Sequence, residues 1–203
     1  MTTRRRRMAA GLALLACAVP VGVAQAVDDG TARSKDNIAV ATTEVDGSRA
    51  FDFSWSLRRQ RGGVVDHRNI ANAAARCTDC RATAIAFQVV LASGSPSVVT
   101  PYNQAVAIND QCTNCVVYAG ARQFVRVTAG YAEFTDEGRA ILNDVRNDLR
   151  ALEDQNLSVA DLTAAVEQQE ARVNKVLLEE VVTTSDEPMR IRERENLQAD
   201  DGA

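Results

Sequence analysis

The 203-residue sequence contains one histidine and few aromatic residues, and it lacks the short motifs that mark common enzyme classes. One histidine cannot supply the two ligands of an H-E-x-x-H motif, so a self-contained zinc protease is excluded. No serine stands in a G-x-S-x-G context, and there is no glycine-rich phosphate loop. Asp66 and His67 are adjacent in a strand-like stretch and should point to opposite faces, so His67 is interpreted as a surface or turn residue. These absences leave no catalytic residue to nominate.

Basic residues are also scarce once the N-terminal segment is set aside. Residues 1–26 contain a basic stretch (2–7), an apolar run (8–23) and a small-residue site (24–26), the pattern of a cleaved signal peptide. The apolar run contains Pro20 and is short for a membrane span, which favours cleavage over an anchor. Removal takes four of the 23 basic side chains and none of the 27 acidic ones, leaving a net charge of −8. That charge argues against nucleic acid or an anionic lipid surface as the main partner.

Cys17 offers an alternative fate for the same segment. Residues 14–17 (LLAC) fit a bacterial lipobox, in which the cysteine is lipidated and held on the membrane. The apolar run continues past Cys17 to the small-residue site, which favours secretion. Membrane anchoring through a lipid at Cys17 stays open as the alternative localisation.

The other four cysteines form two matched motifs, R-C-T-D-C-R at 76–81 and Q-C-T-N-C-V at 111–116. An even number of cysteines in an exported chain favours disulfides, and a C-x-x-C spacing places two cysteines at the corners of one turn. The sequence does not choose among the three possible connectivities. The predicted disulfide cysteines are Cys77, Cys80, Cys112 and Cys115.

Two other chemistries stay open for these cysteines. Four thiolates from two C-x-x-C turns suit a tetrahedral structural zinc site, with the same four cysteines as ligands. Against zinc stand the oxidising compartment and the lack of glycine after each pair, where Arg81 and Val116 are found instead. A redox couple is favoured less, because a thioredoxin-type pair opens a helix and strand-like sequence follows each pair here.

The segments around these motifs have the alternating pattern of strands. Asp46-Gly47 separates two such segments and is a two-residue hairpin signal. Each C-T-x-C also lies between two alternating segments, and residues 58–63 (RRQRGG) are interpreted as an exposed loop. The sequence therefore predicts an antiparallel sheet of about six strands over residues 37–134, built from β-hairpin repeats.

Alignment of the two motifs supports a duplication. It superposes Thr78 on Thr113 and Gln88 on Gln123, and leaves Asn69 and Asn103 one position out of register. The sequence therefore predicts two copies of one hairpin unit, each with a C-T-x-C turn at its tip.

The chain changes character at Thr135. Apolar residues three or four positions apart mark one stripe of a helix: Leu142, Val145, Leu149 and Leu152. Ser158 with Asp161 predicts the start of a second helix. An antiparallel helical hairpin is expected over 135–182. A flexible leader (27–36) is expected before the sheet, and a disordered tail (183–203) after the helices. The predicted fold class is therefore α+β.

One composite pattern covers about residues 64–182. It consists of N-x-A-x-A, C-T-x-C and AIAFQVVL, a second copy of these motifs, and a later L-S-x-x-x-L. It resembles exported, largely uncharacterised actinobacterial proteins with a duplicated C-T-x-C motif, some labelled peptide zinc metalloprotease protein. The resemblance implies export and association with a peptidase, since the chain has no protease zinc motif. We expect a non-catalytic structural or interaction protein of the cell envelope, with a protein partner. A zinc-binding accessory of a membrane peptidase and a thiol-redox protein are the alternatives.

Overall fold

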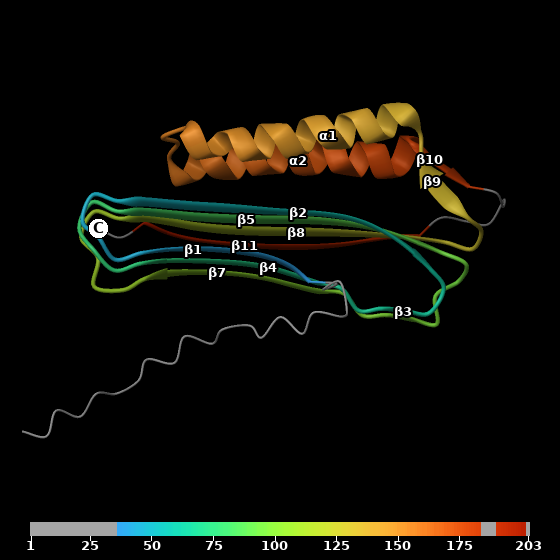
Figure 1. Ribbon diagram of the computed structural model, residues 1–203, viewed down its shortest axis with the longest axis horizontal. Helices are drawn as coiled ribbons and strands as arrows, with labels where there is room; N and C mark the ends of the chain where they lie inside the picture. The colour runs from blue at the N-terminus through green and yellow to red at the C-terminus, as the bar shows by residue number, and fades with distance from the viewer. Residues whose placement is uncertain (1–35, 184–189, 202–203) are drawn as a thin grey trace, which may run out of the picture. The chain divides into compact units, whose positions relative to one another are not determined.

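Three successive turns of the chain follow the same path in the computed structural model, which describes residues 36–183 and 190–201 (Figure 1). Each turn gives one strand to each of two long parallel sheets, ordered β1-β4-β7 and β2-β5-β8, and the first two turns also form the short pair β3-β6. The strands are β1 (Asn37–Thr43), β2 (Arg49–Arg61), β3 (Val64–Val65), β4 (Arg68–Ala75), β5 (Arg81–Ser93), β6 (Val98–Val99), β7 (Tyr102–Asn109) and β8 (Val116–Thr128). The fold is a short parallel solenoid, and we call its turns rung 1 (37–65), rung 2 (68–99) and rung 3 (102–128).

The predicted α+β fold with an antiparallel hairpin sheet is wrong, because the protein is mostly β, with parallel sheets and two helices. In a hairpin the two strands that flank a turn hydrogen-bond to each other. Here the strands that flank each turn belong to different sheets, and β4 and β5 pair in parallel with their counterparts in the rungs before and after. The turns at Asp46-Gly47 and at the two C-T-x-C motifs are therefore solenoid corners. The predicted loop at 58–63 is also corrected, because β2 continues through Arg61.

Alanine fills most of the space between the two long sheets. The buried alanines of this layer are Ala39, Ala41, Ala71, Ala73, Ala75, Ala82, Ala84, Ala86, Ala105, Ala107, Ala119 and Ala121. Side chains this short fill an interior only when the two sheets approach closely, so the layer has no room for larger residues. The alternating small residues that suggested hairpins lie on the inward faces of these strands.

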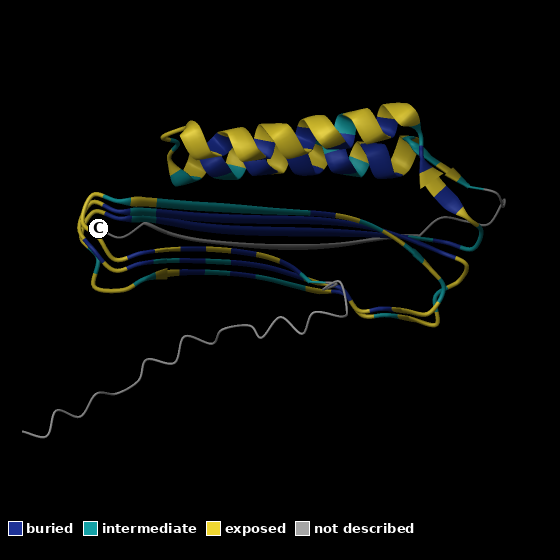
Figure 2. Cartoon of the chain, viewed as in Figure 1, coloured by how far each residue is buried: buried dark blue, intermediate teal, exposed yellow. Residues whose placement is uncertain are grey.

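Two helices cover the other face of the β2-β5-β8 sheet (Figure 1). They are α1 (Asp136–Arg150), which continues into the 3-10 helix η1 (Ala151–Asp154), and α2 (Val159–Glu179). The predicted stripe from Leu142 to Leu152 is buried against the sheet, and Figure 2 shows exposed residues on the outer side of both helices. Ser158 caps α2 by accepting a hydrogen bond from Asp161 N at 3.1 Å, as predicted. The C-terminal pair of helices is confirmed.

Three further strands follow the solenoid. β9 (Ala132–Phe134) and β10 (Val181–Thr183) form an antiparallel pair before α1 and after α2, and β11 (Arg190–Asp201) runs antiparallel beside β8. The predicted disordered tail (183–203) is thus a strand over residues 190–201. Residues 184–189 and 202–203 lie outside the described residues, as do the predicted signal peptide, Cys17 and most of the predicted leader.

Candidate functional site

The candidate site is the corner at which each rung passes from the first long sheet to the second. Rung 2 turns there at 77–80 and rung 3 at 112–115, so both C-T-x-C motifs occupy equivalent places. Thr78 and Thr113 are paired by a parallel bridge, and Asp79 N donates to Thr113 O at 2.9 Å. The two motifs therefore stack directly on each other.

Rung 1 makes the same turn without cysteine. Gly47 N donates to Thr78 O and Thr78 N donates to Asp46 Oδ1, both at 2.8 Å. One residue in each turn has a positive φ: Gly47 at 70°, Asp79 at 56° and Asn114 at 56°. Glycine, aspartate and asparagine are the residues that best tolerate this conformation. The three turns share one backbone shape, and only the second and third are covalently closed.

Each cysteine pair closes within its own turn. Cys77 and Cys80 form one disulfide with Cα atoms 6.0 Å apart, and Cys112 and Cys115 form the other at 5.9 Å. The disulfide prediction is confirmed, and the connectivity that the sequence left open is one bond per turn. Three of the four residues are buried and Cys112 is partly exposed. Any thiol reagent therefore approaches the cluster from the Cys112 side.

Stacking also brings the two disulfides together. The sulfur atoms of Cys77, Cys80 and Cys112 all lie within 4.8 Å of one another. Cys115 Sγ lies 3.0 Å from the main-chain oxygen of Cys77. The predicted zinc ligands thus share one small volume, although the cysteines are paired as disulfides.

Gln111 explains the offset between the two repeats. Rung 3 has one residue more than rung 2 between its asparagine and its first cysteine, and Gln111 is exposed with a φ of 53°. The extra residue is taken up at the corner. Asn69 and Asn103 can therefore pair directly while the cysteines above them also stack.

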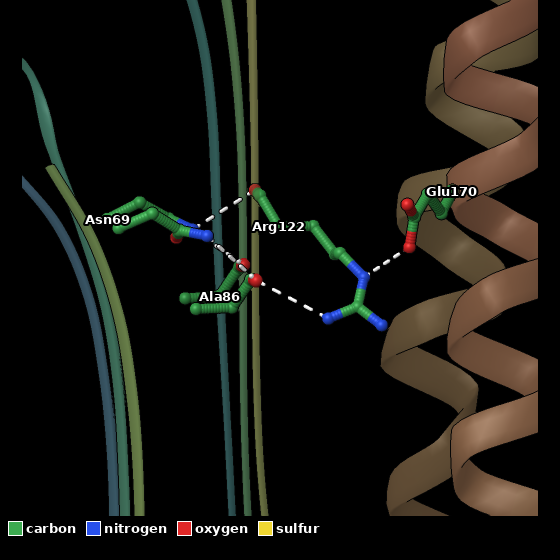
Figure 3. A network of polar contacts seen from close by, with 6 residues as sticks. Asn69, Ala86, Arg122 and Glu170 are labelled. Carbon is green, nitrogen blue, oxygen red and sulfur yellow. Dashed lines mark hydrogen bonds and ion pairs between the residues drawn. The ribbon is translucent and has the colours of Figure 1, made fainter. Parts of the chain in front are cut away.

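A ladder of three asparagines lies at the start of the first-sheet strands. Asn37 Nδ2 donates to Asn69 Oδ1 at 2.7 Å, and Asn69 Nδ2 donates to Asn103 Oδ1 at 2.8 Å. The Asn69 amide also donates to the main-chain oxygens of Ala86 and Arg122 in the facing sheet, at 3.0 Å each (Figure 3). The ladder ties the rungs to one another and the two sheets together. Its sequence signal was the recurrence of asparagine after 32 and then 34 residues.

Arg122 extends this network to the helices. Its main chain accepts from Asn69, whereas its side chain leaves the opposite face of β8 and donates to Glu170 of α2 (Figure 3). Both residues are buried. Removing one member of a buried ion pair leaves the other charge uncompensated, so this contact fixes α2 on the sheet.

Two other polar side chains on the helix-facing side of β8 are wholly buried. Burial raises the pKa of Tyr118 well above its ordinary value, so the Tyr118 hydroxyl stays protonated at neutral pH. Burial lowers the pKa of Arg126, and its three side-chain nitrogens have no hydrogen-bond partner within the described residues. Neither group is a candidate general base.

His67 is buried between β3 and β4, with 4% of its surface exposed. Its Nε2 atom lies 2.9 Å from Gln60 Oε1, and its main-chain oxygen accepts from Gln123 Nε2 at the same distance. The predicted surface position is wrong, because the solenoid folds this connection inward. The contacts of His67 are those of a structural residue.

No protein-family model, curated protein or solved structure matches this chain. No helix within residues 36–183 is long and apolar enough to cross a membrane.

Proposed function

We propose that the chain is an exported, non-catalytic structural or interaction protein of the cell envelope. The observation that supports this is the closure of both C-T-x-C motifs within their own turns at one corner of the solenoid. Disulfides persist in oxidising compartments, and the signal-peptide pattern of residues 1–26 agrees with export. The cysteines then serve to hold the stacked turns in shape.

The way polar groups are used supports a scaffold over a catalyst. The asparagine ladder, the buried Arg122–Glu170 pair and His67 are all engaged in contacts between rungs or layers. Catalytic groups need access to a substrate and a matched partner. A protein of this kind acts through the surface that the scaffold presents, which implies a protein partner in the envelope.

Production of the full 203-residue chain in a secreting bacterial host tests this proposal. We expect a mature protein that begins at Val27, is released from the cytoplasm and contains no free thiol by intact mass. An unprocessed cytoplasmic protein with free thiols would contradict the proposal. A membrane-bound product that begins at an acylated Cys17 would instead support the lipid-anchored form.

A zinc-binding accessory of a membrane peptidase is the second candidate. The observation that favours it is the approach of three sulfur atoms to within 4.8 Å of one another. If a dithiol reductant opens both disulfides, four thiolates at this corner would suit tetrahedral zinc, with Zn–S distances of about 2.3 Å. The thiol-redox alternative has no such support, because strands β5 and β8 follow the cysteine pairs.

The zinc candidate is tested on protein reduced under anaerobic conditions and dialysed against zinc. One zinc per chain, lost in a Cys112→Ser/Cys115→Ser variant, would support it. A reduced protein that retains no zinc after dialysis would contradict it.

A further inference from the structure

Within the described part of the chain, rung 1 leaves one long strand edge unpaired. In the described residues the second sheet has the order β11-β8-β5-β2, so β2 is its last strand, 13 residues long. The opposite edge of the solenoid is different, because β11 runs beside β8 there. An unpaired edge presents main-chain N–H and C=O groups to any strand that can add to it.

The hydrogen bonds at the two ends of β2 show which of its residues face outward. Arg81 N donates to Ser48 O at 3.0 Å, and Gly62 N donates to Ser93 O at 2.7 Å. A parallel ladder uses alternate residues of each strand, so the even-numbered residues of β2 bond to β5. The odd-numbered residues, from Arg49 to Arg61, therefore point their main-chain groups toward the open edge.

The same odd-numbered residues carry two kinds of side chain. Phe51, Phe53 and Trp55 are partly buried and pack against the core beneath the helices. Arg59 and Arg61 follow on the same side of the strand and are exposed. Along its outer edge β2 is thus basic at Arg49, apolar from Phe51 to Leu57 and basic again at Arg59 and Arg61.

The basic end of β2 lies beside a cavity of about 280 Å³, lined by Arg59, Gln60, Arg61, Ser93, Tyr131 and Ala132. The guanidinium of Arg61 stacks over the Tyr131 ring, 5.0 Å from its centroid. Neither Arg59 nor Arg61 has an ion pair within the described part of the chain, although acidic residues outnumber basic ones overall. An acidic group of a binding partner would therefore complement the charge at this end of β2.

Rung 1 closes its interior without closing this edge. Asp52 and Ser54 stand where rung 2 has Ala84 and Ala86. Asp52 Oδ2 accepts from Val40 N at 2.6 Å, and Ser54 Oγ donates to Asn37 Oδ1 at 2.8 Å. These contacts seal the gap between β1 and β2, and they involve none of the outward main-chain groups of β2.

A second copy of the chain is a poor occupant for the edge. Two β2 strands that paired antiparallel about Trp55 would place Arg49 opposite Arg61 of the other copy. A shift of the register toward the C-terminal half brings Arg59 opposite Arg61. Like charges directly opposite each other on paired strands are destabilising.

We propose that the outer edge of β2 binds an extended segment of a partner protein, which adds to the sheet as a further strand. The segment presents apolar side chains opposite Phe51, Phe53 and Trp55, and acidic side chains opposite Arg59 and Arg61. Main-chain hydrogen bonds supply affinity in this mode of recognition, and alternate side chains supply specificity. This inference rests on the proposed role as an interaction protein and names the chemistry of its partner.

Trp55 makes the test direct, because it is the only tryptophan of the chain. The mature disulfide-bonded protein is titrated with two end-capped peptides, VTVTVTVTETE and its reverse, ETETVTVTVTV, which cover the parallel and antiparallel orientations. We expect saturable binding of one of them with a blue shift of Trp55 emission. Replacing both Glu residues of that peptide by Lys should weaken binding at least tenfold.

Variants of the protein locate the site. Arg59→Glu/Arg61→Glu should weaken binding at least tenfold, whereas Arg146→Glu/Arg150→Glu on the exposed side of α1 matches the charge change and should leave binding unchanged. Leu57→Pro removes an outward N–H that no strand of the described residues uses, so it should weaken binding while Leu57→Ala does not. Circular dichroism spectra and melting curves check that each variant is folded.

Equal binding of the Glu and Lys peptides, or binding of neither orientation, would overturn the inference. So would a Trp55 blue shift that grows with protein concentration in the absence of peptide, since it would indicate a second copy at the edge. A protein that is secreted and disulfide-bonded but fails these tests would leave the proposed function standing and remove only this partner.

Discussion

Rung 1 differs from rungs 2 and 3 although all three follow the same path. At the corner, register places Ser48 of rung 1 level with Cys80 of rung 2. In the interior, Asp52 and Ser54 replace the alanines of the other two rungs. Rung 2 has a neighbour on both sides, and β11 runs beside β8 of rung 3, so these rungs can use small side chains and a disulfide. An end rung must satisfy the polar groups of its open side, as terminal repeats of solenoids do.

The interior alanine layer should show the largest difference between the rungs. Ala82 of rung 2 is fully buried, and Ala50 beside it in rung 1 is half-buried. Ala82→Leu should lower the free energy of unfolding by about 3 kcal/mol through overpacking. Ala50→Leu should lower the free energy of unfolding by about 1 kcal/mol, because the larger side chain can move toward the open side of rung 1. Urea denaturation of both variants measures the gap, and equal losses would show that the sheets are not closely packed.

The asparagine ladder should be most sensitive at its centre. Asn69 Oδ1 accepts from Asn37, and the two N–H groups of Asn69 Nδ2 are shared among three oxygens, so Asn69→Ala should destabilise the fold by about 2.5 kcal/mol. Asn103→Ala at the end of the ladder should lose about 1 kcal/mol. The same denaturation measurement compares them, and a larger loss at Asn103 would contradict the ladder.

The disulfides should have a smaller effect, since each closes a very short loop. Cys112→Ser/Cys115→Ser should lower the free energy of unfolding by about 2 kcal/mol in oxidised protein. The converse change is to add a disulfide to rung 1. Val45→Cys/Ser48→Cys should form a third disulfide and raise the free energy of unfolding by about 1 kcal/mol. Each variant is unfolded with and without a reductant. The idea of equivalent corners fails if the new pair does not oxidise.

The seal on rung 1 should have the smallest effect. Asp52→Ala removes the acceptor of Val40 N near the surface, and the loss should be about 1 kcal/mol. Asp52→Asn keeps an acceptor oxygen and should lose less than half of that. Amide hydrogen exchange at Val40 should speed up in the alanine variant, and an unchanged rate would mean that this bond does not form in solution.

The sequence predicted most of the strands and both helices, but not which strands pair. Alternation shows which side chains share a face, and it contains no information on whether a neighbour is the next strand or the same strand one rung later. Rung 1 has no cysteine, so an alignment on C-T-x-C finds only two of the three repeats. Because rung 3 has an extra residue at Gln111, an alignment on the cysteines places Asn69 and Asn103 one position apart and does not reveal the asparagine ladder.

The cysteine site was predictable in kind and not in connectivity. Spacing and compartment indicated disulfides, whereas the choice of partners depends on how the turns stack. The buried pair of Arg122 and Glu170 had no sequence signal, because each looks like an ordinary charged residue in its own segment. His67 was misplaced for the same reason, since its burial depends on the return path of the solenoid.

Each C-T-x-C turn is closed by its own disulfide, and tryptic mapping of the oxidised protein can verify this pairing. Cleavage after Arg76 and Arg81 releases residues 77–81 as a pentapeptide, while Cys112 and Cys115 remain in the fragment 82–122. Free thiols are alkylated first, and the digest is analysed without reduction. We expect an unlinked, unalkylated pentapeptide with a mass two hydrogens below that of the dithiol. A pentapeptide linked to the larger fragment, or alkylated at both cysteines, would contradict it.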